Sequence, residues 1–250
     1  MKKLMMMLAV MSLLIGAAPY GRTSPASAAA KKDKMEAARL AEEKGDTDRL
    51  HANYAAAISQ YEAALRFNRQ SADLYNKLGI AEIKLDQRGP ARKDFGRSLK
   101  INPQFFTALN NMGVLDLLDR RYKSSISYLK RALALDESNA HTHINLANAW
   151  MGLGEVDHAM TEYARALELD ADVLSSSPEG VIAQASSPEQ HARVTFLIAK
   201  SYMKRGNLDG ALEYLRRAKE EHYPDMASVY KDPVFTPLWT DPRLAKIVKR

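Results

Sequence analysis

The feature that most constrains the fold of this chain is a fixed interval at which positions of similar chemistry recur. Leu78-Gly79, Met112-Gly113 and Leu146-Ala147 follow one another in equal steps. A fixed period of about 20–50 residues is typical of repeat proteins, in which one unit cannot bury its apolar side alone and neighbouring units stack. We therefore predict a repeat architecture. We call a set of positions that recurs at this interval a column, and three further columns have the same interval: Ala57, Ala91, Ser125 and Ala159; Tyr61, Phe95, Leu129 and Tyr163; and Ala64, Ser98, Ala132 and Ala166.

Within one unit, the columns fall on the faces of two helices. Leu146, Ala147 and Trp150 share one face of a first helix, because they lie at i, i+1 and i+4. The small–aromatic–small pattern of Ala159–Ala166 gives one face of a second helix, and Gly152-Leu-Gly154 supplies the turn between them. Strand-like alternation is absent after Lys31. The pattern therefore predicts an all-α chain of stacked helix pairs.

These helix–turn–helix units resemble the tetratricopeptide-repeat (TPR) family, whose terminal proline position is occupied by Pro103 in one unit. The resemblance implies a right-handed α-solenoid that binds proteins and carries no catalytic site. Glu82 and Asp116 stand where the family usually has an aromatic residue, so we expect looser packing or local exposure there. The expected units are an irregular TPR-like unit at 31–71 with about seven extra turn residues around Asp46–Ala52, three repeats at 72–105, 106–139 and 140–173, a loop at 174–191, a fourth regular repeat at 192–225 and a C-terminal helical cap at 226–250.

The N-terminal segment at 1–30 has the pattern of a secretory signal peptide. Met1-Lys2-Lys3 is a basic start, Leu4–Ala18 is apolar, and Ala26–Ala30 offers small residues for cleavage after Ala28 or Ala30. A membrane span needs about 20 apolar residues, which is more than Leu4–Ala18 provides. We expect an exported protein, periplasmic or secreted, with no membrane span after cleavage. The alternative is an uncleaved segment that anchors the chain.

Composition excludes several classes of function. The formal net charge is +6, and three of the basic residues lie in the segment at 1–30, so the remainder is close to neutral and nucleic-acid binding is not expected. No cysteine is present, which excludes thiolate metal sites and cysteine nucleophiles. His141 and His143 are two positions apart on a predicted helix and do not share a face, so no metal is expected. Phosphate-binding glycine loops are absent, and we expect no cofactor and no catalytic residue.

In TPR proteins the concave surface, lined by the first helix of each pair, usually contacts the ligand. Asparagines on this surface can bond a peptide backbone through both a donor and an acceptor, and aliphatic residues add apolar contact. The alternative is that several of these side chains pack against neighbouring first helices. The candidate groove residues are Asp73, Asn76, Ile80, Ile83, Thr107, Asn110, Val114, Leu117, His141, Ile144, Asn148, Met151, Arg193, Phe196, Lys200 and Met203.

Together these observations predict a protein- or peptide-binding scaffold or adaptor in the bacterial cell envelope. One alternative is an envelope enzyme or its regulatory subunit, with a site in the loop at 174–191. Another is a structural scaffold that associates with itself as a homo-oligomer. A competing binding surface is the basic C-terminal end, where residues 192–250 carry 12 Lys and Arg against 7 Asp and Glu. The paired basic residues with which some TPR domains hold acidic chaperone tails are not matched by Asn76, Ile80, His141 and Asn145.

Overall fold

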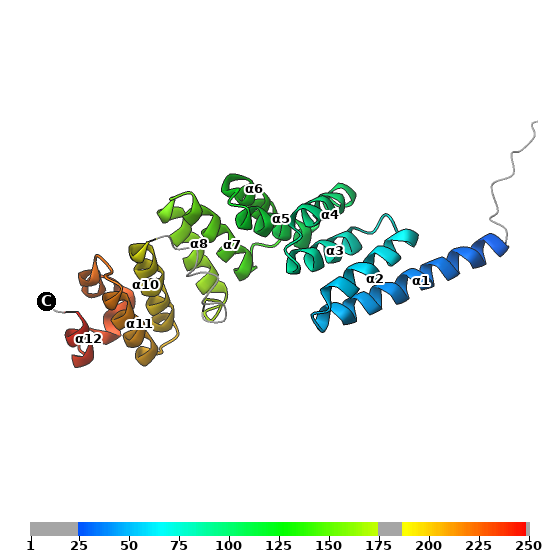
Figure 1. Cartoon of the computed structure of the whole chain (residues 1–250). Coiled ribbons are helices and arrows are strands. Elements are labelled where there is room, and N and C mark those ends of the chain that lie inside the picture. Colours follow the sequence, from blue (N-terminus) through cyan, green and yellow to red (C-terminus); the bar gives the residue numbers. More distant parts are fainter. Residues whose placement is uncertain (1–24, 175–186, 249–250) are drawn as a thin grey trace, which may run out of the picture.

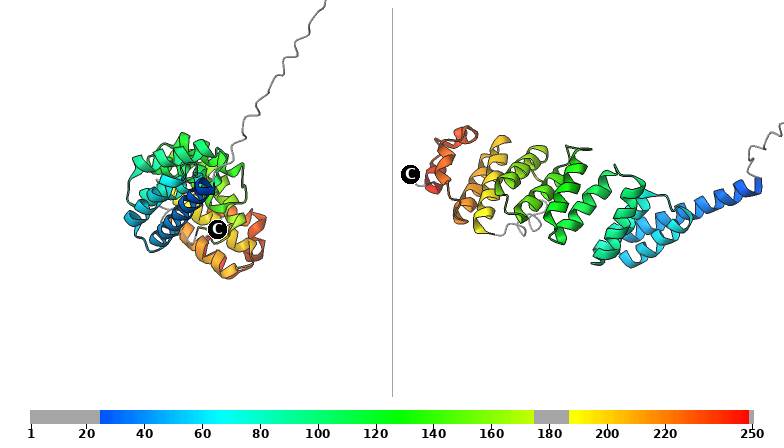
Figure 2. Two further views of the ribbon diagram at one scale, coloured as in Figure 1. Left: turned by 90° about the vertical axis from the view of Figure 1, so that its right-hand side faces the viewer. Right: turned by 90° about the horizontal axis from the view of Figure 1, so that it is seen from above.

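The computed structural model describes residues 25–174 and 187–248, and these residues form consecutive helix pairs along one axis (Figure 1). In the end-on view of Figure 2, successive pairs are turned about the long axis instead of being stacked in one plane. The predicted all-α solenoid is confirmed. The first helices are α1 (Pro25–Leu50), α3 (Ala72–Lys84), α5 (Phe106–Leu118), α7 (Ala140–Gly152) and α10 (Pro188–Lys204). The second helices are α2 (Tyr54–Phe67), α4 (Arg88–Ile101), α6 (Tyr122–Leu133), α8 (Val156–Leu169) and α11 (Leu208–Glu220).

The turn inside each pair repeats with the same period as the sequence. Ala52, Asp86, Arg120 and Gly154 all have a positive φ, between 56° and 81°, and they follow one another in the equal steps seen in the sequence columns. Only glycine adopts this left-handed conformation without steric cost, so three of the four turns are maintained by the packing around them. Gly206 continues the series, since its separation from Gly154 equals one period plus the length of the loop at 174–191. The insertion therefore leaves the register of the repeats unchanged.

Several glycines lie where a side chain of the other helix of the pair leaves no room for a Cβ atom. A Cβ atom added at any of three of them would lie 2.6–2.7 Å from a side-chain atom of the second helix, which is closer than real Cβ contacts. Ala147 and Ala199 occupy the equivalent positions in the later pairs and are fully buried. The three contacts are Gly45 with Tyr61, Gly79 with Phe95 and Gly113 with Leu129.

The first pair is regular, which differs from the prediction of an irregular unit with about seven extra turn residues. Helix α1 runs through Asp46 to Leu50, and Gly45 lies one period before Gly79 with the same contact to its second helix. The alignment of the first unit with the later ones was not recognised in the sequence, because Lys44 stands where the later units have Leu78 or Met112. Helix α1 also extends past the end of α2 (Figure 1), and Ala28 and Ala30 lie in its first turns.

The outer surfaces of the first and last helix pairs are adapted in different ways. On α1, the exposed Thr47 takes the place of residues that are fully buried between neighbouring units, such as Ala81 and Ala149. At the other end a closing segment covers α10 and α11. It consists of η1 (Met226–Tyr230), η2 (Pro233–Leu238) and α12 (Pro242–Ile247), and its Phe235, Leu238 and Leu244 are fully buried.

Both Asp-Pro phrases of the closing segment start a helix, as the sequence predicts. The Asp232 carboxylate accepts a hydrogen bond from the Val234 N–H at 3.1 Å, and Asp241 accepts one from the Arg243 N–H at 2.8 Å. Trp239, also expected to cover the last repeat, is 40% exposed.

The predicted signal segment lies mostly outside the described residues, since the description begins at Pro25. Within the part of the chain that the structure describes, no helix is both long enough and apolar enough to cross a membrane.

Candidate peptide-binding face

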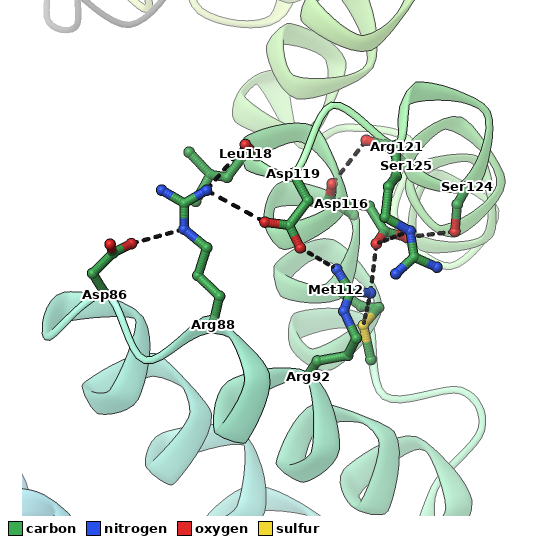
Figure 3. A network of polar contacts seen from close by, with 11 residues as sticks. Asp86, Arg88, Arg92, Met112, Asp116, Leu118, Asp119, Arg121, Ser124 and Ser125 are labelled. Carbon is green, nitrogen blue, oxygen red and sulfur yellow. Dashed lines mark hydrogen bonds and ion pairs between the residues drawn. The ribbon is translucent and has the colours of Figure 1, made fainter.

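The two acids that replace aromatic residues are buried, so the prediction of local exposure at Glu82 and Asp116 is wrong. Asp116 has no exposed surface and receives a hydrogen bond from Arg92 at 2.5 Å and another from Ser124 (Figure 3). Arg92 also reaches Asp119 at 2.7 Å, and this contact continues the network outward. A buried carboxylate is tolerated when its charge is paired and its lone pairs are satisfied. The network therefore joins α4, α5 and α6, and we assign it a structural role.

Glu82 is buried beside a second carboxyl group. Its side chain is 6% exposed, and its Oε2 atom has no hydrogen-bond partner among the described residues. Burial, followed by the negative charge of Asp94, raises the pKa of Glu82 to about 8. Asp94 is itself paired with Arg97 at 2.7 Å. At neutral pH the Glu82 carboxyl group is therefore mainly protonated.

The described residues contain no group of three or more His, Cys, Asp or Glu side chains placed to hold a metal ion.

We call the side of the first helices that faces away from their own second helices the first-helix face. Amide hydrogen bonds connect neighbouring first helices along it. Asn111 Nδ2 donates to Asn76 Oδ1 at 2.9 Å, and Asn145 Nδ2 donates to Asn110 Oδ1 at 3.3 Å. The Thr142 hydroxyl lies 3.2 Å from the same Asn110 oxygen and 2.9 Å from Asn139 Oδ1, and its one proton is shared between these two acceptors. The ladder places α3, α5 and α7 side by side.

The predicted groove residues differ widely in exposure. Some are open to solvent, some are half-buried, and some are buried among other helices. Exposed are Asp73, Thr107 and His141. Half-buried are Ile80, Ile83, Asn110, Val114, Arg193 and Lys200. Buried are Asn76, Leu117, Ile144, Asn148, Met151, Phe196 and Met203.

Asn148, one of the candidate groove residues, contacts the second helix of its own pair. Its side chain is buried, and its Oδ1 atom accepts a hydrogen bond from the hydroxyl of Tyr163 on the second helix of the same pair. Burial raises the pKa of Tyr163 above its ordinary value, so this hydroxyl keeps its proton. Asn148 is therefore part of the packing of its own pair, whereas Asn110 is half-buried.

The face is also closed at α10. The ring of Phe196 stacks on Tyr223, with 4.3 Å between ring centroids, and lies 5.5 Å from Phe235 of the closing segment. Lys200 forms an ion pair with Asp232 at 2.7 Å. Met203 belongs to the same buried cluster. The open part of the first-helix face is therefore formed by α1, α3, α5 and the start of α7.

Two residues of this face were missed by the sequence analysis. Glu42 and Asp46 on α1 contact Lys77 Nζ at 2.6 and 2.9 Å, and Asp73 contacts the same nitrogen at 3.2 Å. The sequence does contain a signal for them. Gly45 lies one repeat period before Gly79, and the same interval aligns Glu42 of α1 with the candidate residue Asn76. Near α1 the face therefore carries three carboxylates around one lysine.

Comparison with known proteins agrees with this architecture. A family model described as tetratricopeptide repeat matches residues 104–179, and a second model of the same description matches residues 192–221. Among curated proteins, a BBSome complex member, BBS4 of Xenopus tropicalis, is 28% identical over 114 residues. That match covers 46% of this chain and 22% of the relative, so this chain corresponds to about a fifth of the relative's length.

Solved structures show the same fold over most of the chain. MamA from Desulfovibrio magneticus RS-1 superposes with a TM-score of 0.54 at 18% identity, and covers 74% of this chain and 94% of its own. YrrB, described as a TPR protein with an unusual peptide-binding site, has a TM-score of 0.53 at 19% identity, with 82% and 96% covered. At such identities the likeness concerns the fold. Together with the family models, it shows an all-α solenoid that contains tetratricopeptide repeats at 104–179 and 192–221.

Proposed function

We propose that this protein is a peptide-binding scaffold or adaptor of the bacterial cell envelope, and that its binding surface is the first-helix face of α3, α5 and α7. The observation that carries the proposal is the amide ladder. Asn110 uses its oxygen to accept from Asn145, whereas its Nδ2 group makes no hydrogen bond within the described residues. Asn145 donates and keeps its own oxygen available. The pair thus offers one donor and one acceptor, which a peptide group can match.

Apolar side chains lie beside the amides. Ile80, Ile83 and Val114 are half-buried, so each retains surface that a partner can cover. Covering apolar area contributes about 25 cal/mol per Å², and each backbone hydrogen bond adds about 0.5–1.5 kcal/mol net. A short extended segment can therefore gain affinity from several weak contacts in register.

The ladder also fixes the geometry before a partner binds. The oxygen of Asn110 accepts from Asn145 of α7, so its amide group is oriented without the partner. Such preorganisation reduces the entropy lost on association. Recognition through backbone groups selects an extended conformation, while the apolar contacts select side chains. YrrB, which has the same fold, is described as having a peptide-binding site.

Location in the cell envelope is the second part of the proposal. It is supported by the basic start at Lys2-Lys3 and the apolar stretch Leu4–Ala18.

The test is a selection of binding peptides from a random display library, followed by affinity measurements on the purified protein. Asn110→Ala is expected to weaken a selected peptide about 2- to 12-fold, since the lost hydrogen bond is worth about 0.5–1.5 kcal/mol. Val114→Asp places a charge beside the apolar surface and should weaken binding further. Ser127→Asp, at an exposed position of α6, is the control and should leave affinity unchanged. Full affinity in both Asn110→Ala and Val114→Asp would refute the proposal.

A further inference from the structure

A separate cavity lies between α8, α10 and η2. It has a volume of about 300 Å³ and is lined by residues of α8, α10 and η2. Leu167, Leu197 and Val234 provide apolar walls from these three elements, and Ala164 adds a small side chain. Ligand pockets range from about 300 to 1,000 Å³, so this cavity suits one large side chain and is too small for a whole cofactor.

The rim of the cavity carries an excess of positive charge. Lys204 Nζ lies 3.1 Å from Glu168 Oε1, and Arg165 approaches the other oxygen of the same carboxylate at 3.5 Å. The hydrogen bond from Lys204 holds the pKa of Glu168 below its ordinary value, so Glu168 stays ionised. Two cations therefore share one carboxylate. The Lys204 side chain is 52% exposed, which leaves its ammonium group able to bind a second anion from solvent.

The other lysine at the rim is already neutralised. Lys200 is paired with Asp232 of the closing segment at 2.7 Å, and this contact helps to hold η2 against α10. It leaves Lys204 as the rim cation best placed to receive a new partner. An apolar cavity bordered on one side by an available ammonium group is complementary to an apolar side chain followed by a carboxylate.

We propose that this cavity is an anchoring site for an acidic partner segment, which inserts one bulky apolar side chain between α8, α10 and η2 and places an adjacent carboxylate on Lys204. The partner is a protein or peptide with a Leu or aromatic residue next to Asp, Glu or a chain-terminal carboxylate. The site is separate from the first-helix face of α3, α5 and α7, because its walls come from α8, α10 and η2. Burial of one such side chain is worth about 10- to 150-fold in affinity.

The experiment uses three short synthetic peptides and methyl NMR of the purified protein. The first peptide carries one phenylalanine next to two glutamates, the second has alanine in place of phenylalanine, and the third has lysines in place of the glutamates. The first peptide should shift the methyl signals of Leu167, Leu197 and Val234 in a saturable manner. The other two should bind at least tenfold more weakly.

Variants localise the site. Ala164→Leu fills the cavity and should abolish these shifts, with a thermal melt to show that the protein remains folded. Lys204→Gln should weaken the first peptide about 3- to 10-fold, whereas Lys246→Gln removes a lysine elsewhere in the C-terminal region and should have no effect. Asn110→Ala on the first-helix face should also have no effect. Absence of saturable shifts at the three methyl groups, or equal binding of the lysine peptide, would overturn the proposal. An equal loss in Lys246→Gln and Lys204→Gln would show general charge attraction and would overturn it as well.

Discussion

Gly113 is the position where one added side chain tests the repeat packing most directly. In the change Gly113→Leu, the new Cβ would lie 2.6 Å from Leu129 Cγ and 2.7 Å from Leu129 Cδ2. Carbon atoms pack best at about 3.5–4.0 Å, so one of the two helices must move by about 1 Å. Leu129 is fully buried in a cluster with Ile126 and Leu146, so its side chain has no open space to enter. Overpacking of this kind costs about 1–3 kcal/mol of unfolding free energy.

A control is needed because leucine also favours helix more than glycine does, by about 0.8–1 kcal/mol. Gly96 lies within α4, and a Cβ atom there meets no described atom within 4 Å. Gly96→Leu therefore gains the helix propensity without the clash. The difference between the two variants isolates the cost of overpacking, which we expect to be about 1–3 kcal/mol.

The assay is unfolding followed by circular dichroism, with heat and with urea. For a chain of this size, 1 kcal/mol corresponds to about 2–4 °C in Tm, so Gly113→Leu should melt about 2–12 °C below Gly96→Leu. Equal melting temperatures for the two variants would refute the tight packing of Gly113 against Leu129.

Three further predictions follow from the buried groups and from the N-terminus. Because the pKa of Glu82 is raised to about 8 in the folded protein, its protonated form stabilises the fold at low pH, and this contribution is lost as the pH rises from about 4.5 to about 8. Glu82→Gln should therefore be more stable than the wild type at pH 8 and gain little at pH 4.5 in urea unfolding, and an identical effect at both pH values would contradict the raised pKa. Asn148→Ala should lower the unfolding free energy by about 1–3 kcal/mol, since it leaves the buried Tyr163 hydroxyl without its acceptor. The same variant should keep its affinity for peptides selected on the first-helix face, and a large loss of affinity in a stable Asn148→Ala protein would restore Asn148 to the binding surface. Export predicts that protein isolated from its own cells begins at Ala29 or Lys31 when its N-terminus is sequenced, whereas an intact Met1 on a cytosolic protein would exclude it.

The fold could be predicted because its determinants are local. The Gly79–Phe95 contact and its equivalents require particular side-chain sizes at fixed separations, and these sizes are visible in the sequence. The first pair was misjudged where one position broke the pattern. Lys44 stands in the apolar column that otherwise holds Leu78, and this obscured the alignment that Gly45 would have provided.

The exposure of the candidate groove residues could be predicted only in part, because burial on a solenoid depends on the angle between neighbouring pairs. A helical wheel shows that Met151 faces away from its own packing column, but it cannot show that other helices cover it. Phe196 is covered by Tyr223 and by Phe235, which lie beyond the second helix of its own pair in the chain. Asn110 is half-buried, and its hydrogen bond from Asn145 could not be read from a helical wheel, since the donor comes from the next repeat.

The separate adaptation of the first and last helix pairs has a consequence for how this chain can change in length. Thr47 adapts α1 to solvent, and the closing segment covers α10 and α11, so neither end depends on the number of units between them. The turn at Asp86 and its equivalent at Arg120 repeat with the same geometry, which makes the inner units interchangeable in their connections. Each unit contacts only its neighbours in such an array. Duplication of residues 72–105 would therefore lengthen the surface by one unit and leave both ends as they are.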